Sequence, residues 1–219
     1  MASFEKVMVQ ILINEGGLSK NKGDRGNYRG FKVGNGPFLG TKYGISAGLY
    51  CELHPDLSDA QVRSRIVNLT ESEAKDIYKL EFWVKSNFAS LNNDTIAYQF
   101  MDHLINAGGA GLGKVIRLLK SKYPFLILLQ SIKDNKTKFF PDEIAKINAI
   151  ENEAFYRDIQ VARVKAYPAS SDYDDNRKRP LRVRYEKKKT KPKSKSGIRN
   201  SSSVWDWLTG ASKDKKFRL

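Results

Sequence analysis

Residues 4–17 read FEKVMVQILINEGG and carry a clear helical pattern. The apolar residues recur at intervals of three and four positions, which puts them on one face of an α-helix. Gly16 and Gly17 follow and are expected to end it. The segment therefore predicts an amphipathic helix packed on a core, with Glu15 at its C-terminal end. The apolar stripe consists of Phe4, Val7, Met8, Ile11 and Leu12.

The segment after this helix, from Gly17 to Gly40, is polar and rich in glycine. Turn signals occur at Lys22-Gly23-Asp24 and at Gly34-Asn35-Gly36, and no helical or strand periodicity interrupts them. We therefore expect a long loop or a small hairpin region. Loops of this length inside a compact domain are usually functional.

Two capping boxes predict helices beyond the loop. Ser58 with Gln61, and Thr70 with Glu73, have the spacing in which each partner binds a free backbone N–H of the other. They predict helices over about 59–68 and 71–85.

Further helices are expected in the second half of the sequence. One should run over about 94–107 and close at Gly108-Gly109, with a second apolar stripe following over 112–119. Pro141 suits a first helical turn and predicts one long helix through Ala166. Strands do not alternate with helices and no internal repeat is visible. The predicted fold class is therefore all-α, or mainly α.

Composition narrows the class of protein. The chain has 219 residues, 40% of them hydrophobic, and a single cysteine. This balance excludes fibrous and disulfide-stapled chains. The longest apolar run, 125–129, is far below the roughly 20 residues that span a bilayer. No secretory signal is predicted, because no basic region precedes an apolar stretch at the N-terminus.

The net charge of +15 is distributed unevenly. Between Arg177 and Arg199 there are 12 basic residues and only one acidic residue, Glu186. Such a segment has too little apolar surface to offset the entropy of ordering. We predict a compact domain over 1–168 and a basic, low-complexity C-terminal arm over 169–219 with a Trp-containing terminal segment. The arm is expected to bind an anionic surface: a cell-wall polymer, a membrane, a virion protein or nucleic acid. The alternative is a solvated tail.

Several kinds of catalytic site are disfavoured because the residues that they need are scarce in this sequence. Two histidines and one cysteine are too few for a convincing zinc site, so neither a metal nor another cofactor is predicted. A nucleophilic pair of Cys51 and His103 is conceivable, although a small buried thiol and an ordinary helix histidine are the more common outcome. Neither a phosphate-binding loop nor a Gly-x-Ser-x-Gly motif occurs.

Carboxylates remain as candidates for catalysis. Glu15 is expected to be partly shielded and near the negative end of the helix dipole, and both effects raise the pKa of a carboxyl group. Asp24 lies nine positions later in the loop. A proton donor facing a second carboxylate is the arrangement that glycoside hydrolysis needs. Two solvated acids are the alternative on spacing alone.

Four motifs in order resemble the glycoside hydrolase family 108 muramidases, which are common among phage endolysins. The resemblance covers residues 4–108 and implies an all-helical, lysozyme-like fold. The motifs are Asn14-Glu15-Gly16-Gly17; Asp24-Arg25-Gly26-Asn27 with Gly40-Thr41-Lys42-Tyr43-Gly44; Glu73-Ala74, Ile77-Tyr78 and Phe82-Trp83; and Asp102-His103-Leu104-Ile105-Asn106-Ala107-Gly108.

The resemblance implies cleavage of the β-1,4 bond between N-acetylmuramic acid and N-acetylglucosamine in the glycan strands of peptidoglycan. It gives Glu15 the role of catalytic acid. The order Glu, Asp, Thr also resembles the triad of phage T4-type lysozymes, which would assign Asp24 to the attacking water and Thr41 to its support. Many relatives have the Thr close behind the Asp, whereas here Tyr28 to Leu39 intervene.

Other residues of these motifs are expected to bind substrate. Asp102 and Asn106, four positions apart on one helix, could bind N-acetyl groups or instead brace the loop. The aromatic side chains of Tyr28, Phe31 and Tyr43 could stack on sugars or act as lids over a core. Trp83 is expected to belong to the helix packing. The predicted substrate-binding residues are Gly16, Gly17, Asn27, Tyr28, Tyr43, Asp102 and Asn106.

An alternative function keeps the fold without catalysis: a peptidoglycan-binding or virion structural protein anchored through its basic arm. A phage muramidase without a signal peptide would stay in the host cytoplasm until holin-dependent release, or would be carried in the virion. The sequence does not choose between host lysis and wall penetration.

Overall fold

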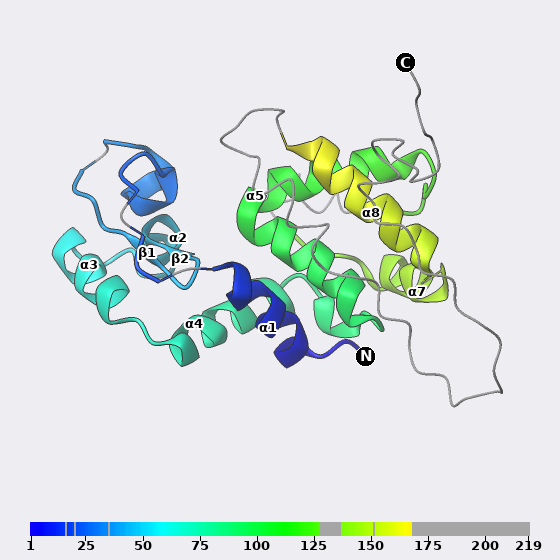
Figure 1. Cartoon of the computed structure of the whole chain (residues 1–219), viewed down its shortest axis with the longest axis horizontal. Coiled ribbons are helices and arrows are strands. Elements are labelled where there is room, and N and C mark those ends of the chain that lie inside the picture. The colour runs from blue at the N-terminus through cyan, green and yellow to red at the C-terminus, as the bar shows by residue number, and fades with distance from the viewer. Residues whose placement is uncertain (16, 20, 35, 128–136, 151, 168–219) are drawn as a thin grey trace, which may run out of the picture. The chain divides into compact units, whose positions relative to one another are not determined.

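The computed structural model describes residues 1–15, 17–19, 21–34, 36–127, 137–150 and 152–167 (Figure 1). These residues form two compact units, one over residues 8–81 and one that combines residues 1–7 with the described residues from 82 onward. Most of the described residues are helical. The predicted mainly α fold is therefore confirmed. The arm over 169–219 lies outside the described residues, so the predicted boundary at residue 168 stays a prediction.

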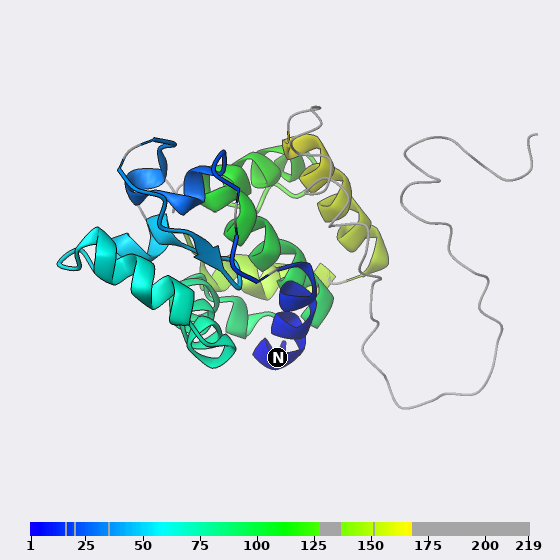
Figure 2. The ribbon, with the colours of Figure 1, turned by 60° about the vertical axis from the view of Figure 1, so that its left-hand side comes forward.

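The unit over residues 8–81 contains one small antiparallel hairpin between helices. Strand β1 (Thr41–Lys42) pairs with β2 (Ile45–Ser46), and α3 lies beside β1 (Figure 2). Ser46 ends the hairpin and caps the next helix, because its hydroxyl accepts a hydrogen bond from the Leu49 N–H at 3.2 Å. The helices of this unit are α1 (Phe4–Asn14, whose first residues belong to the other unit), α2 (Ala47–Leu53), α3 (Asp59–Asn68) and α4 (Glu71–Tyr78).

Both predicted capping boxes are present, and they set the starts of α3 and α4. Helix α3 has the predicted bounds. The helix predicted over 71–85 differs, since α4 ends at Tyr78 and continues as a π-helix, η3 (Lys79–Val84). Helix α2 carries no strong stop or start signal in the sequence other than its Ser cap, and it was not predicted.

The loop that precedes the hairpin contains two single-turn 3-10 helices, η1 (Arg25–Asn27) and η2 (Arg29–Phe31). Of the two alternatives predicted for 17–40, the described residues form the long loop, and the small hairpin follows it at residues 41–46. Leu39, Ile45, Val62 and Ile66 are buried and hold the loop end, the hairpin and α3 together.

The second unit is built on α5 (Asp94–Lys120) and α8 (Glu153–Ala166), which pack side by side (Figure 1). Helix α5 is broken at Gly108, whose φ of 65° lies in the left-handed region, as the glycine pair predicted. Aromatic side chains fill much of the core, with Phe100 and Phe139 ring centroids 4.9 Å apart. Trp83 is buried and packs edge-on against Phe4 and Phe88, which confirms its predicted place in the helix packing. A short 3-10 helix, η4 (Phe88–Ser90), precedes α5.

The single helix predicted over 141–166 is wrong. The structure has α7 (Pro141–Ile150) and α8 as separate helices. Asn152 lies in extended backbone and its side chain accepts a hydrogen bond from the Phe155 N–H at 2.9 Å. This N-cap starts a new helix, which an uninterrupted apolar pattern does not reveal.

Candidate active site

The β1–β2 hairpin is the centre of the candidate site. Thr41 pairs with Ser46 and Lys42 with Ile45, so Tyr43 and Gly44 form a two-residue turn. Their φ angles are 51° and 75°, and positive values at both positions are what a type I′ turn requires. The Lys42 ammonium group donates to the Val67 carbonyl oxygen at 2.8 Å and ties the hairpin to α3.

Glu15 contacts the turn of this hairpin. It follows the last residue of α1, and its backbone N–H is held by the carbonyl oxygens of Ile11 and Leu12, each at 3.2 Å. A Cβ placed on Gly44 would lie 2.9 Å from Glu15 Oε2 and 3.0 Å from its Cδ. The half-buried Glu15 carboxyl group therefore lies directly against the bare face of Gly44.

Asp24 and Thr41 come together at the other end of the hairpin. Asp24 Oδ1 accepts a hydrogen bond from the Gly26 N–H at 2.8 Å and caps η1. A Cβ placed on Gly26 would lie 3.1 Å from Ser46 Cβ, 3.3 Å from Asp24 Oδ1 and 3.7 Å from Thr41 Oγ1. Both side chains thus border one point, although residues 25–40 separate them in the sequence.

The Thr41 hydroxyl group is buried, and no hydrogen-bond partner for Oγ1 exists among the described residues. A buried hydroxyl without a partner costs about 1 to 3 kcal/mol. Such groups in proteins commonly bind an ordered water or a ligand. Beside the Asp24 carboxylate, Thr41 Oγ1 is suited to hold a water molecule.

Asn27 explains how the chain returns to Asp24 after twelve further residues. Its carbonyl oxygen accepts the N–H groups of Leu39 at 2.9 Å and Gly40 at 3.3 Å, which closes the segment 28–39 at its base. Its side-chain amide donates to the Asn21 carbonyl oxygen at 2.7 Å and to the Ser19 hydroxyl at 3.2 Å. Asn27 is fully buried, so these contacts make it a brace of the loop.

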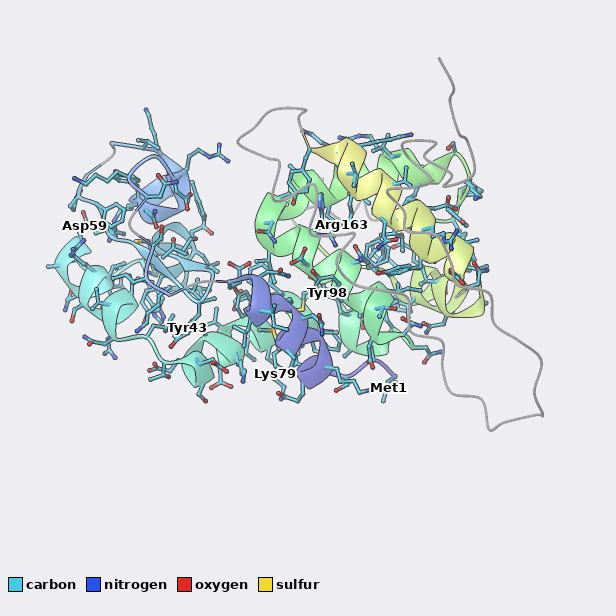
Figure 3. All side chains as sticks on the ribbon, viewed as in Figure 1. Met1, Tyr43, Asp59, Lys79, Tyr98 and Arg163 are labelled. Atoms are coloured by element: carbon cyan, nitrogen blue, oxygen red, sulfur yellow. The ribbon has the colours of Figure 1, made fainter. Side chains whose placement is uncertain are left out.

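One salt bridge and several hydrogen bonds connect the segment 28–39 to α3 and to the residues just before this helix. The Arg29 guanidinium group binds Asp59 at 2.7 Å and the Leu57 carbonyl oxygen at 2.8 Å. Asp59 is the first residue of α3, and Figure 3 labels it there. The Arg63 guanidinium group binds the Phe38 carbonyl oxygen from the same helix.

The remaining residues predicted to bind substrate in this unit differ in exposure. Tyr28 is buried, and its hydroxyl donates to the Lys22 carbonyl oxygen at 2.9 Å, which favours the lid over the sugar-stacking alternative. Tyr43 is half-buried at the hairpin turn, and its label in Figure 3 lies between the hairpin and α4. Gly17 is exposed, with open space around it. Gly16 lies outside the described residues.

Asp102 and Asn106 belong to the second unit and have internal contacts. Asp102 is 1% exposed and forms an ion pair with Arg163 of α8, which Figure 3 labels. Arg163 also donates to the Gln99 side-chain carbonyl. The Asn106 side chain donates to the Asp102 backbone carbonyl at 2.8 Å. These contacts favour bracing over sugar binding, and the braced element is α8 rather than the loop.

Cys51 and His103 are both buried, as the more common outcome predicted. Burial raises the pKa of the Cys51 thiol, which is the opposite of what a nucleophilic cysteine needs. Burial, together with the nearby Arg163 charge, lowers the pKa of His103 to about 3, so the imidazole is neutral at physiological pH. Within the described residues no group of acidic, histidine and cysteine side chains is arranged to bind a metal ion. No described helix is long and apolar enough to cross a membrane.

The structure also reveals residues that sequence reasoning did not assign to the site. Gly44 and Gly26 provide the two close approaches, and Tyr78 reaches the hairpin from α4. Tyr78 lies inside one of the four motifs, so its presence there was a usable signal. Its partner lies 35 positions away, and no sequence pattern indicates that distance.

Residues 8–108 match the family model described as Glycosyl hydrolase 108. The match confirms, over this part of the chain, the resemblance indicated by the four motifs. Peptidoglycan hydrolysis is the activity that this similarity supports.

Among solved structures, the chain is similar to SagA of Brucella abortus. The TM-score is 0.55 at 17% sequence identity, over 82% of this chain and 94% of that chain. At this identity the likeness concerns the fold alone. No curated protein matches the sequence.

Proposed function

We propose that the chain is an N-acetylmuramidase, which hydrolyses the β-1,4 bond between N-acetylmuramic acid and N-acetylglucosamine in peptidoglycan. The observation that carries the proposal is the pair of carboxyl side chains, Glu15 and Asp24, at opposite ends of one short hairpin. In this proposal Glu15 is the general acid, and Asp24 activates a water molecule.

The role proposed for Asp24, activation of a water molecule, implies an inverting mechanism. Glu15 contacts the turn residue Gly44, whereas Asp24 Oδ1 and the Ser46 side chain both border Gly26. Carboxyl groups of inverting glycosidases are about 6.5 to 9.5 Å apart, which leaves room for the attacking water.

The proposed reaction needs two proton transfers. Glu15 gives its proton to the glycosidic oxygen as the bond from that oxygen to the anomeric carbon breaks. Asp24 accepts a proton from water, whose oxygen bonds to the anomeric carbon from the opposite face. The Thr41 hydroxyl, which lies beside Asp24, orients this water. The products are two shorter glycan chains, one of them with a new reducing end.

Product analysis of purified peptidoglycan tests the proposal. After digestion and borohydride reduction, mass spectrometry is expected to detect muramitol at the new chain ends. Proton NMR during the first turnovers should detect the α-anomer, because attack by water inverts the β-linkage. Reduced N-acetylglucosamine ends or new amino groups would contradict the proposal. So would chain ends that cannot be reduced, because water would then not have attacked.

A substitution of Thr41 tests the assignment of the water site. Thr41→Val keeps the shape of the side chain and removes a hydroxyl that is buried without a partner among the described residues. We expect an unchanged or slightly higher melting temperature, because no buried group loses a partner, and a roughly 10-fold or greater loss of kcat.

Thr41→Ser is the matched control, since it retains the hydroxyl group and should keep most of the activity. The two variants are compared by thermal melts and by initial rates on soluble glycan strands. Equal activity of Thr41→Val and the parent protein would remove Thr41 from the mechanism.

The biological setting is also part of the proposal. We infer a phage muramidase that acts in host lysis or in wall penetration, with the basic arm attached to an anionic surface. The charge of the segment from Arg177 to Arg199 supports an electrostatic attachment. A non-catalytic peptidoglycan-binding protein is the rival, and the product analysis separates the two.

A further inference from the structure

Tyr78 is a buried polar residue of the first unit to which the proposed reaction assigns no role. It is the last residue of α4, where the helix passes into the π-helix Lys79–Val84, and its side chain is completely buried. Its hydroxyl group donates a hydrogen bond to the Tyr43 carbonyl oxygen at 3.0 Å. The partner is therefore the backbone of the hairpin turn that Glu15 contacts.

The hydroxyl of Tyr78 and the carboxyl of Glu15 meet at one point of that turn. A Cβ placed on Gly44 would lie 2.2 Å from the Tyr78 hydroxyl oxygen and 2.9 Å from Glu15 Oε2. Real Cβ atoms do not approach other atoms so closely. Only a glycine fits at position 44, and its bare face lets both groups approach the turn.

We propose that Tyr78 is a positioning residue for the general acid: together with the bare face of Gly44, it fixes the hairpin turn against which the Glu15 carboxyl group is oriented. The inference rests on the proposed role of Glu15. Tyr78 does not contact the reacting bond in this proposal and acts through the turn.

The physical argument starts from the strain of the turn. Tyr43 has a φ of 51°, which non-glycine residues rarely adopt and which persists only where neighbouring groups hold it. The hydrogen bond from the buried Tyr78 side chain is such a restraint. A displacement of about 1 Å can cost roughly 100-fold in rate when a proton donor must reach its acceptor.

The first test removes the hydroxyl alone. Tyr78→Phe is expected to lower kcat on soluble peptidoglycan glycan strands about 10-fold or more, with KM changed less than about two-fold. Tyr50→Phe is the matched control, because Tyr50 is another buried tyrosine of the same unit, packed against the His54 ring. Tyr50→Phe should have the kcat of the parent protein. A purely structural role of Tyr78 would lower the melting temperature and leave kcat of the folded protein unchanged.

The second test fills the bare face of the glycine. Gly44→Ala is expected to lose nearly all activity, because the new methyl group would displace the hydroxyl or the carboxyl group. Gly34→Ala is the matched control: Gly34 has nearly the same φ, 74° against 75°, but no atom lies within 4 Å of its Cβ position. Both variants place an alanine at nearly the same positive φ, whereas only the one at position 44 meets neighbouring atoms.

Combining the two substitutions makes the inference quantitative. In the Tyr78→Phe background, Gly44→Ala should reduce kcat by a smaller factor than in the parent protein, because the closest clashing atom is gone. The inference is overturned if Tyr78→Phe has parental kcat, or if Gly44→Ala and Gly34→Ala behave alike. Glu15→Gln, assayed in parallel, distinguishes failure of the proposed function from failure of this inference. An active Glu15→Gln variant overturns the proposed function. An inactive Glu15→Gln variant together with a fully active Tyr78→Phe variant overturns only this inference.

Discussion

Glu15→Gln is expected to lose nearly all hydrolysis of peptidoglycan while folding like the parent protein. Glutamine has almost the same shape as glutamic acid but has no acidic proton to give to the glycosidic oxygen. Residues that act as general acids contribute about 10² to 10⁴-fold to the rate. The measurement is the initial rate of release of reducing ends from purified peptidoglycan, with thermal melts to verify the fold.

Two control variants test whether the loss of activity is specific to position 15. Glu5→Gln changes the same chemical group at an exposed position of α1, and Cys51→Ala removes the only thiol, which is buried. Both should retain activity. If Glu15→Gln keeps more than about a tenth of the parental rate, Glu15 is not the general acid.

Arg163→Met is expected to cause the largest loss of stability. Arg163 and Asp102 are almost completely buried and form an ion pair between α8 and α5. Removing the guanidinium group leaves an unpaired carboxylate in the core, which costs about 3 to 5 kcal/mol. A change of 1 kcal/mol shifts the melting temperature of a domain of this size by about 2 to 4 °C. Thermal melts should therefore show a decrease of roughly 6 to 20 °C.

The same helix supplies the control for this experiment. Arg157 of α8 binds Glu153 at 2.7 Å, but both side chains are more than a third exposed. Exposed pairs contribute at most about 1 kcal/mol, so Arg157→Met should have little effect. The double variant Asp102→Leu with Arg163→Met should be more stable than Arg163→Met alone, because no buried charge remains. Equal melting temperatures of Arg163→Met and Arg157→Met would show that the buried pair does not clamp the two helices.

Structural features that depend on residues close together in the sequence could be predicted from it. The capping boxes at Ser58 and Thr70 use partners three positions away, and both helices begin where those pairs indicated. The break at Gly108 was predictable for the same reason, since a left-handed φ is a property of the glycine itself. The break before α8 was missed because it depends on one cap, Asn152, inside an otherwise continuous apolar pattern.

Contacts between distant residues were not predictable in this way. The sequence singled out Asp102 on a helix face, but its partner Arg163 is 61 positions away. Both side chains are charged and almost completely buried, which the ion pair between them allows. Similarly, Asp24 and Thr41 are far apart in the sequence, and this separation gave no indication that they lie close together. Two hydrogen bonds to the Asn27 carbonyl oxygen bring the two residues together, and neither composition nor periodicity indicates these bonds.

The closure of residues 28–39 at Asn27 has a consequence for the evolution of the enzyme. Because the chain leaves and re-enters the hairpin region at one point, the length of this segment is uncoupled from the positions of Asp24 and Thr41. Lengthening a loop whose ends are already fixed costs little, about 0.6 kcal/mol for each doubling of its length. The segment is therefore a place where insertions can change the length of the loop while Asp24 and Thr41 keep their positions relative to each other.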